Sequence, residues 1–225
     1  MKKRLKIDNY IVDVYFEYNN KEIPLVILNS FEDDGSQIYD LVSNEKNFIL
    51  VNISNINWND DLSCWYMDSV FPKDKPFGGK ADNYLDIIIN RVIPAVRDVI
   101  DILDIKISYY AIAGYSLAGL FALYSIYKTD IFDRVMCASS SFWFNNFKEY
   151  VLSFKPNKIS KIYFSLGDRE HLTKNVIMST VLDNTMDIYN YFSNLNILTV
   201  FEKNKGNHFQ DVNLRISKGI SSILD

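Results

Sequence analysis

The segment Tyr109–Lys128, YYAIAGYSLAGLFALYSIYK, constrains the fold of this chain more than any other stretch. Its first half alternates like a buried strand and its second half has the apolar spacing of a buried helix, so a strand is predicted to turn directly into a helix. Such a tight bend has room only for small residues, and Gly114, Ala118 and Gly119 supply them. The polar Ser116 lies at the join, where the turn directs its side chain outward over the carboxyl edge of a sheet.

This strand–turn–helix arrangement is that of a nucleophile elbow. The pattern G-x-S-x-[AG] is short and occurs by chance in unrelated proteins, so the apolar strand before it and the Ala/Leu-rich helix after it are what support the prediction here. The helix N-terminus directs free N–H groups and its positive dipole end toward the serine. Ser116 is therefore the candidate nucleophile.

Strands and helices are predicted to alternate along the chain. The predicted strands are Tyr10–Glu17, Leu25–Asn29, Phe48–Ile53, Ser108–Gly114, Arg134–Ala138, Lys161–Leu166 and Ile197–Phe201. The predicted helices are Ser36–Leu41, Ala81–Leu103 with a kink near Pro94, Ser116–Tyr127, Phe147–Leu152, Asn175–Phe192 and Phe209–Leu224. This alternation indicates an α/β fold with a mostly parallel sheet covered on both faces, and the 225 residues fit one domain spanning 1–225.

The longest irregular region is Ser54–Lys80, and loops of this length in compact domains are usually functional or disordered. Its aromatic residues Trp58, Trp65 and Tyr66 favour a functional loop. No insertion between a predicted strand and helix is long enough for a separate lid domain, so we expect an open site.

Composition excludes several classes of function. The net charge of −4 gives no reason to expect a nucleic-acid or anionic-membrane partner, and no run reaches the roughly eighteen apolar residues of a spanning helix. The opening MKKRLK is followed by a strand-like pattern instead of a signal-peptide core, so a cytoplasmic location is expected. Cys64 and Cys137 form no C-x-x-C pair, and no metal or organic cofactor is expected. The sequence leaves the oligomeric state open.

A serine nucleophile needs an imidazole to take its proton and a third group to hold that imidazole. In the hydrolase chain order, the acid follows the serine and the histidine comes last. His208, in the loop sequence KNKGNHFQD between the last predicted strand and helix, fits this order. His171 is the alternative base, although it lies far from the chain end.

The predicted acid lies in the segment KIYFSLGDREHLTKN, where a strand ends in a glycine turn. In related folds the carboxylate commonly lies three residues after such a glycine, and counting from Gly167 gives Glu170. Asp168 is the alternative, although an aspartate at this place often caps the turn. The backbone N–H of Leu117 is expected to stabilise the tetrahedral oxyanion, together with the N–H of Ser54 or Asn55 after the third predicted strand.

These motifs resemble the putative esterase family of α/β-hydrolases, which contains esterase D-like enzymes and trilactone siderophore esterases. The resemblance runs from about Phe48 to the C-terminus. It rests on WNDDLSCW, similar to a D-L-[ST]-P-W segment, on FGGKADNYLDIIINRVIPAV, similar to a G-G-x-x-x-[FY]-L…IP helix, and on AGYSLAGLFALY, SLGDRE and GNHF. It implies an α/β-hydrolase fold and serine-dependent hydrolysis of a small-molecule ester. The chain departs from the family at Cys64, where proline is usual, and at Ala118, where glycine is usual.

No arginine follows the third predicted strand of the kind that siderophore esterases carry near their substrate, so the resemblance points to ester hydrolysis more than to a siderophore. The sequence predicts a serine carboxylic-ester hydrolase that forms an acyl-enzyme on a small or extended ester. An acyltransferase with the same triad, or an inactive binding protein of the same fold, are the alternatives. The candidate substrate-binding side chains at the carboxyl edge of the sheet are Trp58, Trp65, Tyr115 and Trp143.

Overall fold

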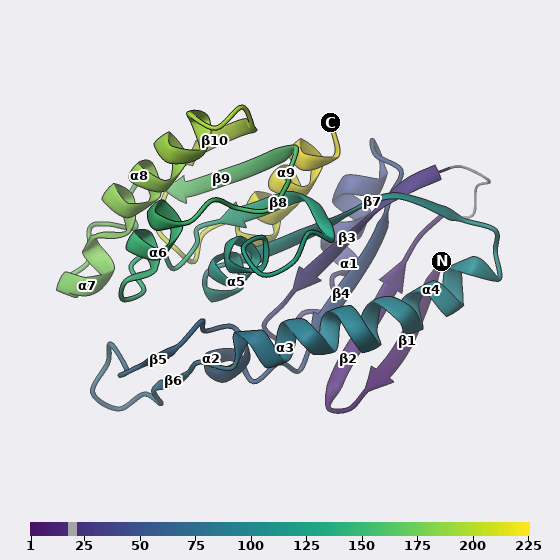
Figure 1. The fold of residues 1–225 in the computed structure, drawn as a ribbon, viewed down its shortest axis with the longest axis horizontal. Coiled ribbons are helices and arrows are strands. Elements are labelled where there is room, and N and C mark those ends of the chain that lie inside the picture. Colours follow the sequence, from purple (N-terminus) through teal and green to yellow (C-terminus); the bar gives the residue numbers. More distant parts are fainter. Residues whose placement is uncertain (18–21) are drawn as a thin grey trace.

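A computed structural model describes residues 1–17 and 22–225 of the chain. Its centre is an eight-stranded sheet in the order β1-β2-β4-β3-β7-β8-β9-β10 (Figure 1). The strands are β1 (Lys2–Ile7), β2 (Tyr10–Tyr15), β3 (Glu22–Asn29), β4 (Ile49–Ser54), β7 (Lys106–Tyr115), β8 (Phe132–Ala138), β9 (Lys161–Gly167) and β10 (Leu198–Asn204). From β4 to β10 all neighbours are parallel, whereas β2 is antiparallel to β1 and β4. The predicted mostly parallel α/β sheet is confirmed.

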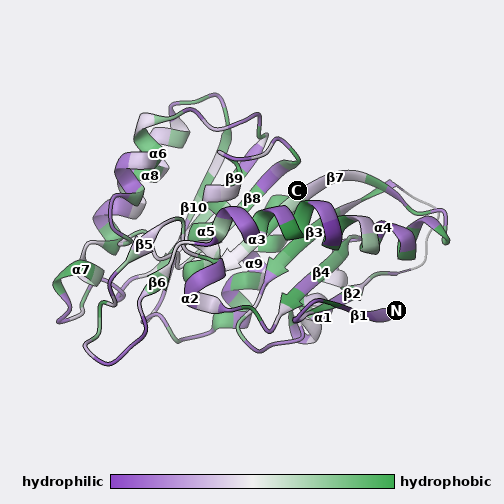
Figure 2. Ribbon diagram, turned by 60° about the horizontal axis from the view of Figure 1, so that its bottom comes forward, coloured by the Kyte–Doolittle hydropathy of each residue, from purple (hydrophilic) through white to green (hydrophobic). Residues whose placement is uncertain are grey.

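Helices cover both faces of the sheet. One face packs against α1 (Ser36–Ser43) and α9 (Val212–Leu224). The other face packs against α3 (Ala81–Ile87), α4 (Ile93–Asp101), α5 (Leu117–Ser125), α6 (Phe147–Ser153) and α8 (Val181–Ser193), which follows the short α7 (Val176–Ser179). The central strands β3 and β4 are strongly hydrophobic in Figure 2, as expected for strands buried on both sides. In the part of the chain that the structure describes, no helix combines the length and the hydropathy needed to cross a membrane.

The structure adds elements that the sequence pattern did not predict. The basic opening residues form β1, whose side chains are mostly exposed and charged because it is an edge strand. The region Ser54–Lys80 contains α2 (Trp58–Asp61) and a small hairpin of β5 (Tyr66–Met67) and β6 (Phe77–Gly78). No separate lid domain covers the sheet edge in the described residues.

The predicted long helix after this region is interrupted near Pro94. A π-helical turn, Ile88–Val92, separates α3 from α4, and Pro94 falls in the first turn of α4. Proline has no N–H to donate to the preceding turn, so a wider turn before it is the local solution. The α-helix is therefore interrupted directly before α4, close to the place where the sequence predicts a kink.

The bend between β7 and α5 depends on close backbone approach at Gly114. A Cβ atom on Gly114 would overlap the backbone carbonyl of Ala118, which cannot move without shifting α5. We therefore expect Gly114→Ala to lower the free energy of unfolding by about 3 kcal/mol, the upper part of the range for overpacked sites. Urea denaturation followed by far-UV circular dichroism measures this loss.

Gly219→Ala is the matched control for Gly114→Ala. Its added Cβ would meet side-chain atoms of Met136 and Tyr163 and no backbone atom of another element, and alanine also favours the helix α9. Its loss of stability should be clearly smaller. Equal urea midpoints for Gly114→Ala and the unmodified chain would contradict the described packing of the bend.

Candidate active site

Ser116 stands at the bend between β7 and α5 with a left-handed backbone, φ 59° and ψ −124°. A non-glycine residue in this region is strained, and the strain is held here by hydrogen bonds on both sides. The Ser116 N–H donates to the carbonyl of Ala138 (3.1 Å), and the Ser116 carbonyl accepts from the N–H of Ser141 (3.0 Å). Leu117 is the first residue of α5, so its N–H has no partner within the helix.

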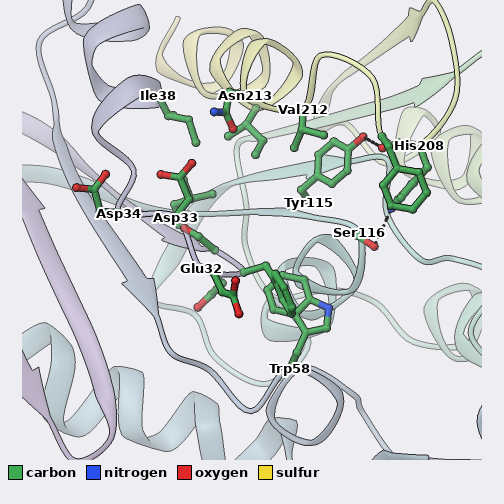
Figure 3. A pocket seen from close by; sticks show the side chains of 16 residues that line it. Glu32, Asp33, Asp34, Ile38, Trp58, Tyr115, Ser116, His208, Val212 and Asn213 are labelled. Carbon is green, nitrogen blue, oxygen red and sulfur yellow. Dashed lines mark hydrogen bonds between the residues drawn. The ribbon is translucent and has the colours of Figure 1, made fainter. Parts of the chain in front are cut away.

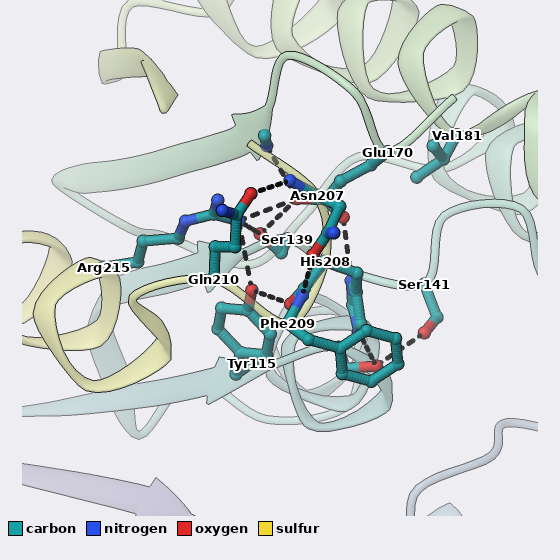
Figure 4. A network of polar contacts seen from close by, with 12 residues as sticks. Tyr115, Ser139, Ser141, Glu170, Val181, Asn207, His208, Phe209, Gln210 and Arg215 are labelled. Atoms are coloured by element: carbon teal, nitrogen blue, oxygen red, sulfur yellow. Dashed lines mark hydrogen bonds and ion pairs between the residues drawn. The ribbon is translucent and has the colours of Figure 1, made fainter. Parts of the chain in front are cut away.

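Three side chains from separate loops form one hydrogen-bonded chain (Figure 4). Nε2 of His208 lies 3.0 Å from Oγ of Ser116, and Nδ1 of His208 lies 2.8 Å from Oε2 of Glu170. The three residues follow β7, β9 and β10, whose parallel carboxyl ends meet at one edge of the sheet. The structure thus brings together the serine, the histidine and the acid that the sequence singled out.

The carboxylate of Glu170 is buried and fully engaged. Its Oε1 accepts hydrogen bonds from the Ser139 hydroxyl (2.7 Å), the Gly167 N–H (2.6 Å) and Nη1 of Arg215 (3.1 Å). Burial alone would raise the pKa of Glu170, but the hydrogen bond and charge of His208 and the bonds from Ser139 and Gly167 hold that pKa below its ordinary value. The carboxylate is therefore ionised at neutral pH.

Arg215 is a residue that the sequence reading missed. Its side chain is 1% exposed, and it donates to Tyr115 and Ser139 (3.2 Å each), to Glu170, and to the Lys205 carbonyl (2.9 Å). It therefore joins α9 to the loops that carry the acid and the histidine. An arginine on an amphipathic helix normally lies on the solvated face. Nothing in the sequence therefore distinguished Arg215 from an ordinary surface arginine.

Arg215→Met is expected to lower the free energy of unfolding by about 3–5 kcal/mol, because it leaves the buried Glu170 charge short of a partner. The measurement is urea denaturation at neutral pH. Arg97→Met is the control, since the Arg97 side chain is exposed and its ion pair with Asp101 is loose (3.9 Å). A loss at Arg215 no larger than at Arg97 would contradict the ion pair beneath the site.

Asp168 and His171, the alternative acid and the alternative base, lie outside the hydrogen-bonded chain of Ser116, His208 and Glu170. Oδ1 of Asp168 accepts from the Gly206 N–H (2.8 Å), which ties the loop after β9 to the loop after β10. His171 lines a separate small cavity with Leu182 and Met186, and it makes no hydrogen bond to Ser116. Asp168 therefore shapes the turn, and His171 is not placed to receive the serine proton.

The prediction that Ser54 supplies the second oxyanion donor is wrong. Ser54 ends β4 and pairs with Ile11 of β2, and the whole of β3 lies between β4 and β7. Because neighbouring strands are about 4.8 Å apart, Ser54 and the following Asn55 lie about 10 Å from the strand that carries Ser116. The sequence pattern did not predict β1, so the third predicted strand is β4. The donor was therefore expected in the loop after β4 instead of the loop after β3.

The loop next to Ser116 follows β3, which pairs in parallel with β7. In this loop the Ser30 N–H already donates to the Ile53 carbonyl (2.9 Å). The next residue, Phe31, lines the same cavity as Ser116, and its N–H has no hydrogen-bond partner among the described residues. The N–H of Phe31 is therefore the better candidate for the second oxyanion donor. Finding it requires the order of the strands in the sheet.

The four predicted aromatic residues do not all reach the site. Trp58 borders both cavities that contain Ser116, Trp143 borders the smaller one, and Tyr115 borders the larger one. The Tyr115 hydroxyl also donates to the His208 carbonyl (2.6 Å), so this residue supports the loop of the histidine. The prediction for Trp65 is wrong: its indole N–H donates to the Asn145 carbonyl (3.0 Å), and its ring packs in an aromatic cluster of Phe144, Phe147 and Tyr150.

Comparison with protein families agrees with this geometry. The family described as "Putative esterase" matches residues 10–208, which is most of the chain. The chain belongs to the putative esterase family. Family membership supports ester hydrolysis as the activity of this site. A search of curated proteins finds no match.

Solved structures show the same fold at low sequence identity. The siderophore hydrolase EstA from Aspergillus nidulans has a TM-score of 0.77 and 18% identity, covering 98% of this chain and 92% of its own. An IroE-like serine hydrolase from Shewanella oneidensis has a TM-score of 0.80 and 16% identity, covering 100% of this chain and 79% of its own. The enterobactin esterase FES from Shigella flexneri has a TM-score of 0.72 and 15% identity, covering 99% of this chain and 58% of its own. The chain therefore has the α/β-hydrolase fold.

Proposed function

We propose that this esterase is a serine carboxylic-ester hydrolase that works through an acyl-enzyme intermediate. The observation that carries the proposal is the continuous hydrogen-bonded chain from Glu170 through His208 to Ser116. The strained bend holds the serine in this position, and the buried carboxylate fixes the ring orientation of His208. A Ser–His–acid constellation of this geometry is recognised by its roles and not by sequence position.

In this mechanism Oγ of Ser116 attacks the ester carbonyl while Nε2 of His208 takes the hydroxyl proton. Glu170 stabilises the resulting imidazolium and stays ionised. The N–H groups of Leu117 and Phe31 bind the negative oxygen of the tetrahedral intermediate. The imidazolium then returns its proton to the leaving alcohol, and water, activated by the same histidine, releases the acid.

A fluorophosphonate probe tests the nucleophile directly. We expect one covalent adduct, located on the tryptic peptide that contains Ser116, and no adduct after the protein is unfolded before labelling. A binding protein of this fold without activity would give no adduct. An adduct on another serine of the site, such as Ser141, would contradict the assignment.

Glu170→Gln keeps the shape of the side chain but removes the charge that stabilises the imidazolium. We expect kcat for p-nitrophenyl acetate to fall by about 10²–10⁴-fold with KM little changed. Asp168→Asn is the matched control, because it keeps the acceptor that holds the Gly206 N–H, and it should cost much less activity. A larger loss in Asp168→Asn than in Glu170→Gln would remove Glu170 from the triad.

A further inference from the structure

The hydroxyl of Ser116 lies where two unequal cavities meet. The larger has a volume of about 810 Å³ and extends along the loop after β3, α1 and α9 (Figure 3). The smaller has a volume of about 170 Å³ and is bounded by Leu117, Ser141 and Trp143. Small-molecule sites usually measure about 300–1,000 Å³, so the larger cavity has room for most of a ligand and the smaller one only for a short group.

The position of His208 decides which part of the ester enters which cavity. The imidazolium must hand its proton to the oxygen of the leaving alcohol, so the alcohol leaves on the side of His208. His208 lines the larger cavity and is absent from the lining of the smaller one. The alcohol portion therefore belongs in the larger cavity and the acyl portion in the smaller one.

The larger cavity has a negative wall opposite the catalytic residues. Glu32, Asp33 and Asp34 line it, and no lysine or arginine does among the described residues (Figure 3). Asp34 is paired with Lys2 (2.7 Å) on the outer side. Glu32 and Asp33 form no ion pair with any residue that the structure describes, so their charges act on whatever occupies the cavity.

A second feature of the same cavity independently indicates a polar ligand. Asn29 lines the cavity and is 2% exposed. Its Oδ1 accepts from the Tyr84 hydroxyl (2.6 Å), whereas its Nδ2 has no hydrogen-bond partner in the described chain. A buried donor without a partner is costly, and an acceptor atom of a water or of a ligand in the cavity removes that cost.

We propose that the substrate is an ester of a short acyl group with a larger alcohol that carries a cationic nitrogen. This inference rests on the proposed function, because it uses the proton transfer from His208 to place the alcohol. The carboxylates of Glu32 and Asp33 attract the cation along the apolar wall formed by Ile38, Val212 and Ile216. An anionic alcohol would be repelled by the same carboxylates.

Three thioesters that differ in charge test the proposal. Acetylthiocholine and its neutral isostere, with a tert-butyl group in place of the trimethylammonium, are the matched pair, and an acetyl thioester of a mercaptocarboxylic acid of similar length supplies the negative charge with a different end group. Release of the thiol is followed by a colorimetric thiol reagent. We expect kcat/KM to be about tenfold higher for the cation than for the neutral isostere at low ionic strength, lowest for the anion, and the preference to shrink as salt is added.

The double variant Glu32→Gln/Asp33→Asn should bring the ratio of cationic to neutral kcat/KM close to one. The ratio is the readout because a change that affects both thioesters equally cancels in it. The Asp33→Asn substitution keeps a side-chain oxygen that can accept the Gly35 N–H, so the loop should hold its shape. Asp98→Asn/Asp101→Asn on α4 is the matched control for net charge, since neither residue lines either cavity. An unchanged ratio in the Glu32/Asp33 variant, or a ratio near one in the unmodified enzyme, would overturn the proposal.

The acyl side has its own test with p-nitrophenyl esters of increasing acyl length. We expect kcat/KM to fall steeply beyond a short acyl chain, and Trp143→Ala to relax this limit because it enlarges the smaller cavity. A long acyl chain preferred by the unmodified enzyme would overturn the assignment of the cavities. Fluorophosphonate labelling of Ser116 distinguishes failure of this inference from failure of the proposed function. Labelling without the predicted substrate selectivity would contradict this inference alone. Absence of labelling would contradict the proposed function.

Discussion

Ser116→Ala is expected to abolish hydrolysis of p-nitrophenyl acetate, with kcat lower by at least about 10⁴-fold, while the urea midpoint stays within a small margin of the unmodified chain. The reason is that in the proposed mechanism the hydroxyl supplies the attacking oxygen, and that it contributes little packing because it borders two cavities. Steady-state release of p-nitrophenol by the purified variant measures the effect.

Ser141→Ala is the matched control for this prediction. Oγ of Ser141 lies 3.4 Å from Oγ of Ser116 but makes no contact with His208, so its loss should cost less than about tenfold. If Ser116→Ala kept appreciable turnover, or if Ser141→Ala were the more damaging change, Ser116 would not be the nucleophile.

His208→Ala should reduce kcat by a similar factor. The only imidazole within hydrogen-bond distance of the Ser116 hydroxyl belongs to His208 among the described residues, so the hydroxyl would keep its proton in the variant. The measurement is again the release of p-nitrophenol at neutral pH. Because the members of a triad act as a unit, Ser116→Ala/His208→Ala should be no worse than either single variant.

His171→Ala provides the control for His208→Ala, since it removes the other histidine of the chain from a cavity away from the serine. It should keep most of the activity. A larger loss in His171→Ala than in His208→Ala would transfer the role of base to His171 and contradict the geometry of the site.

The sequence predicted the centre of this fold better than its edges. The C-terminal parts of β7 and β8 and the whole of β9 are buried, and the apolar residues of these segments located the strands. The edge strand β1 is largely charged and exposed, and nothing in its pattern separates it from a solvated tail. The short hairpin of β5 and β6 was not predicted either, because its two-residue strands are too short to show any periodicity.

For the site, too, the sequence predicted the residues that local motifs identify and missed those that depend on contacts between distant segments. Ser116, His208 and Glu170 each follow a strand in a recognisable loop, so the chain order of their motifs was enough to select them. The oxyanion loop depends on which strand lies beside β7, and that is a property of the sheet order. The role of Arg215 depends on its burial beneath two loops that are distant from each other in the sequence. Trp65 was misplaced because its indole binds Asn145, which is also distant in the sequence.

The proposed mechanism requires that Ser116 carry an acyl group during turnover. Rapid acid quenching during hydrolysis of p-nitrophenyl acetate, followed by intact-mass and peptide-mass spectrometry, tests it most directly. We expect a species heavier by one acetyl group, with the added mass on the peptide that contains Ser116, and no such species in Ser116→Ala. Sustained hydrolysis with no acetylated species at any quench time, or an acetyl group on a different residue, would contradict it.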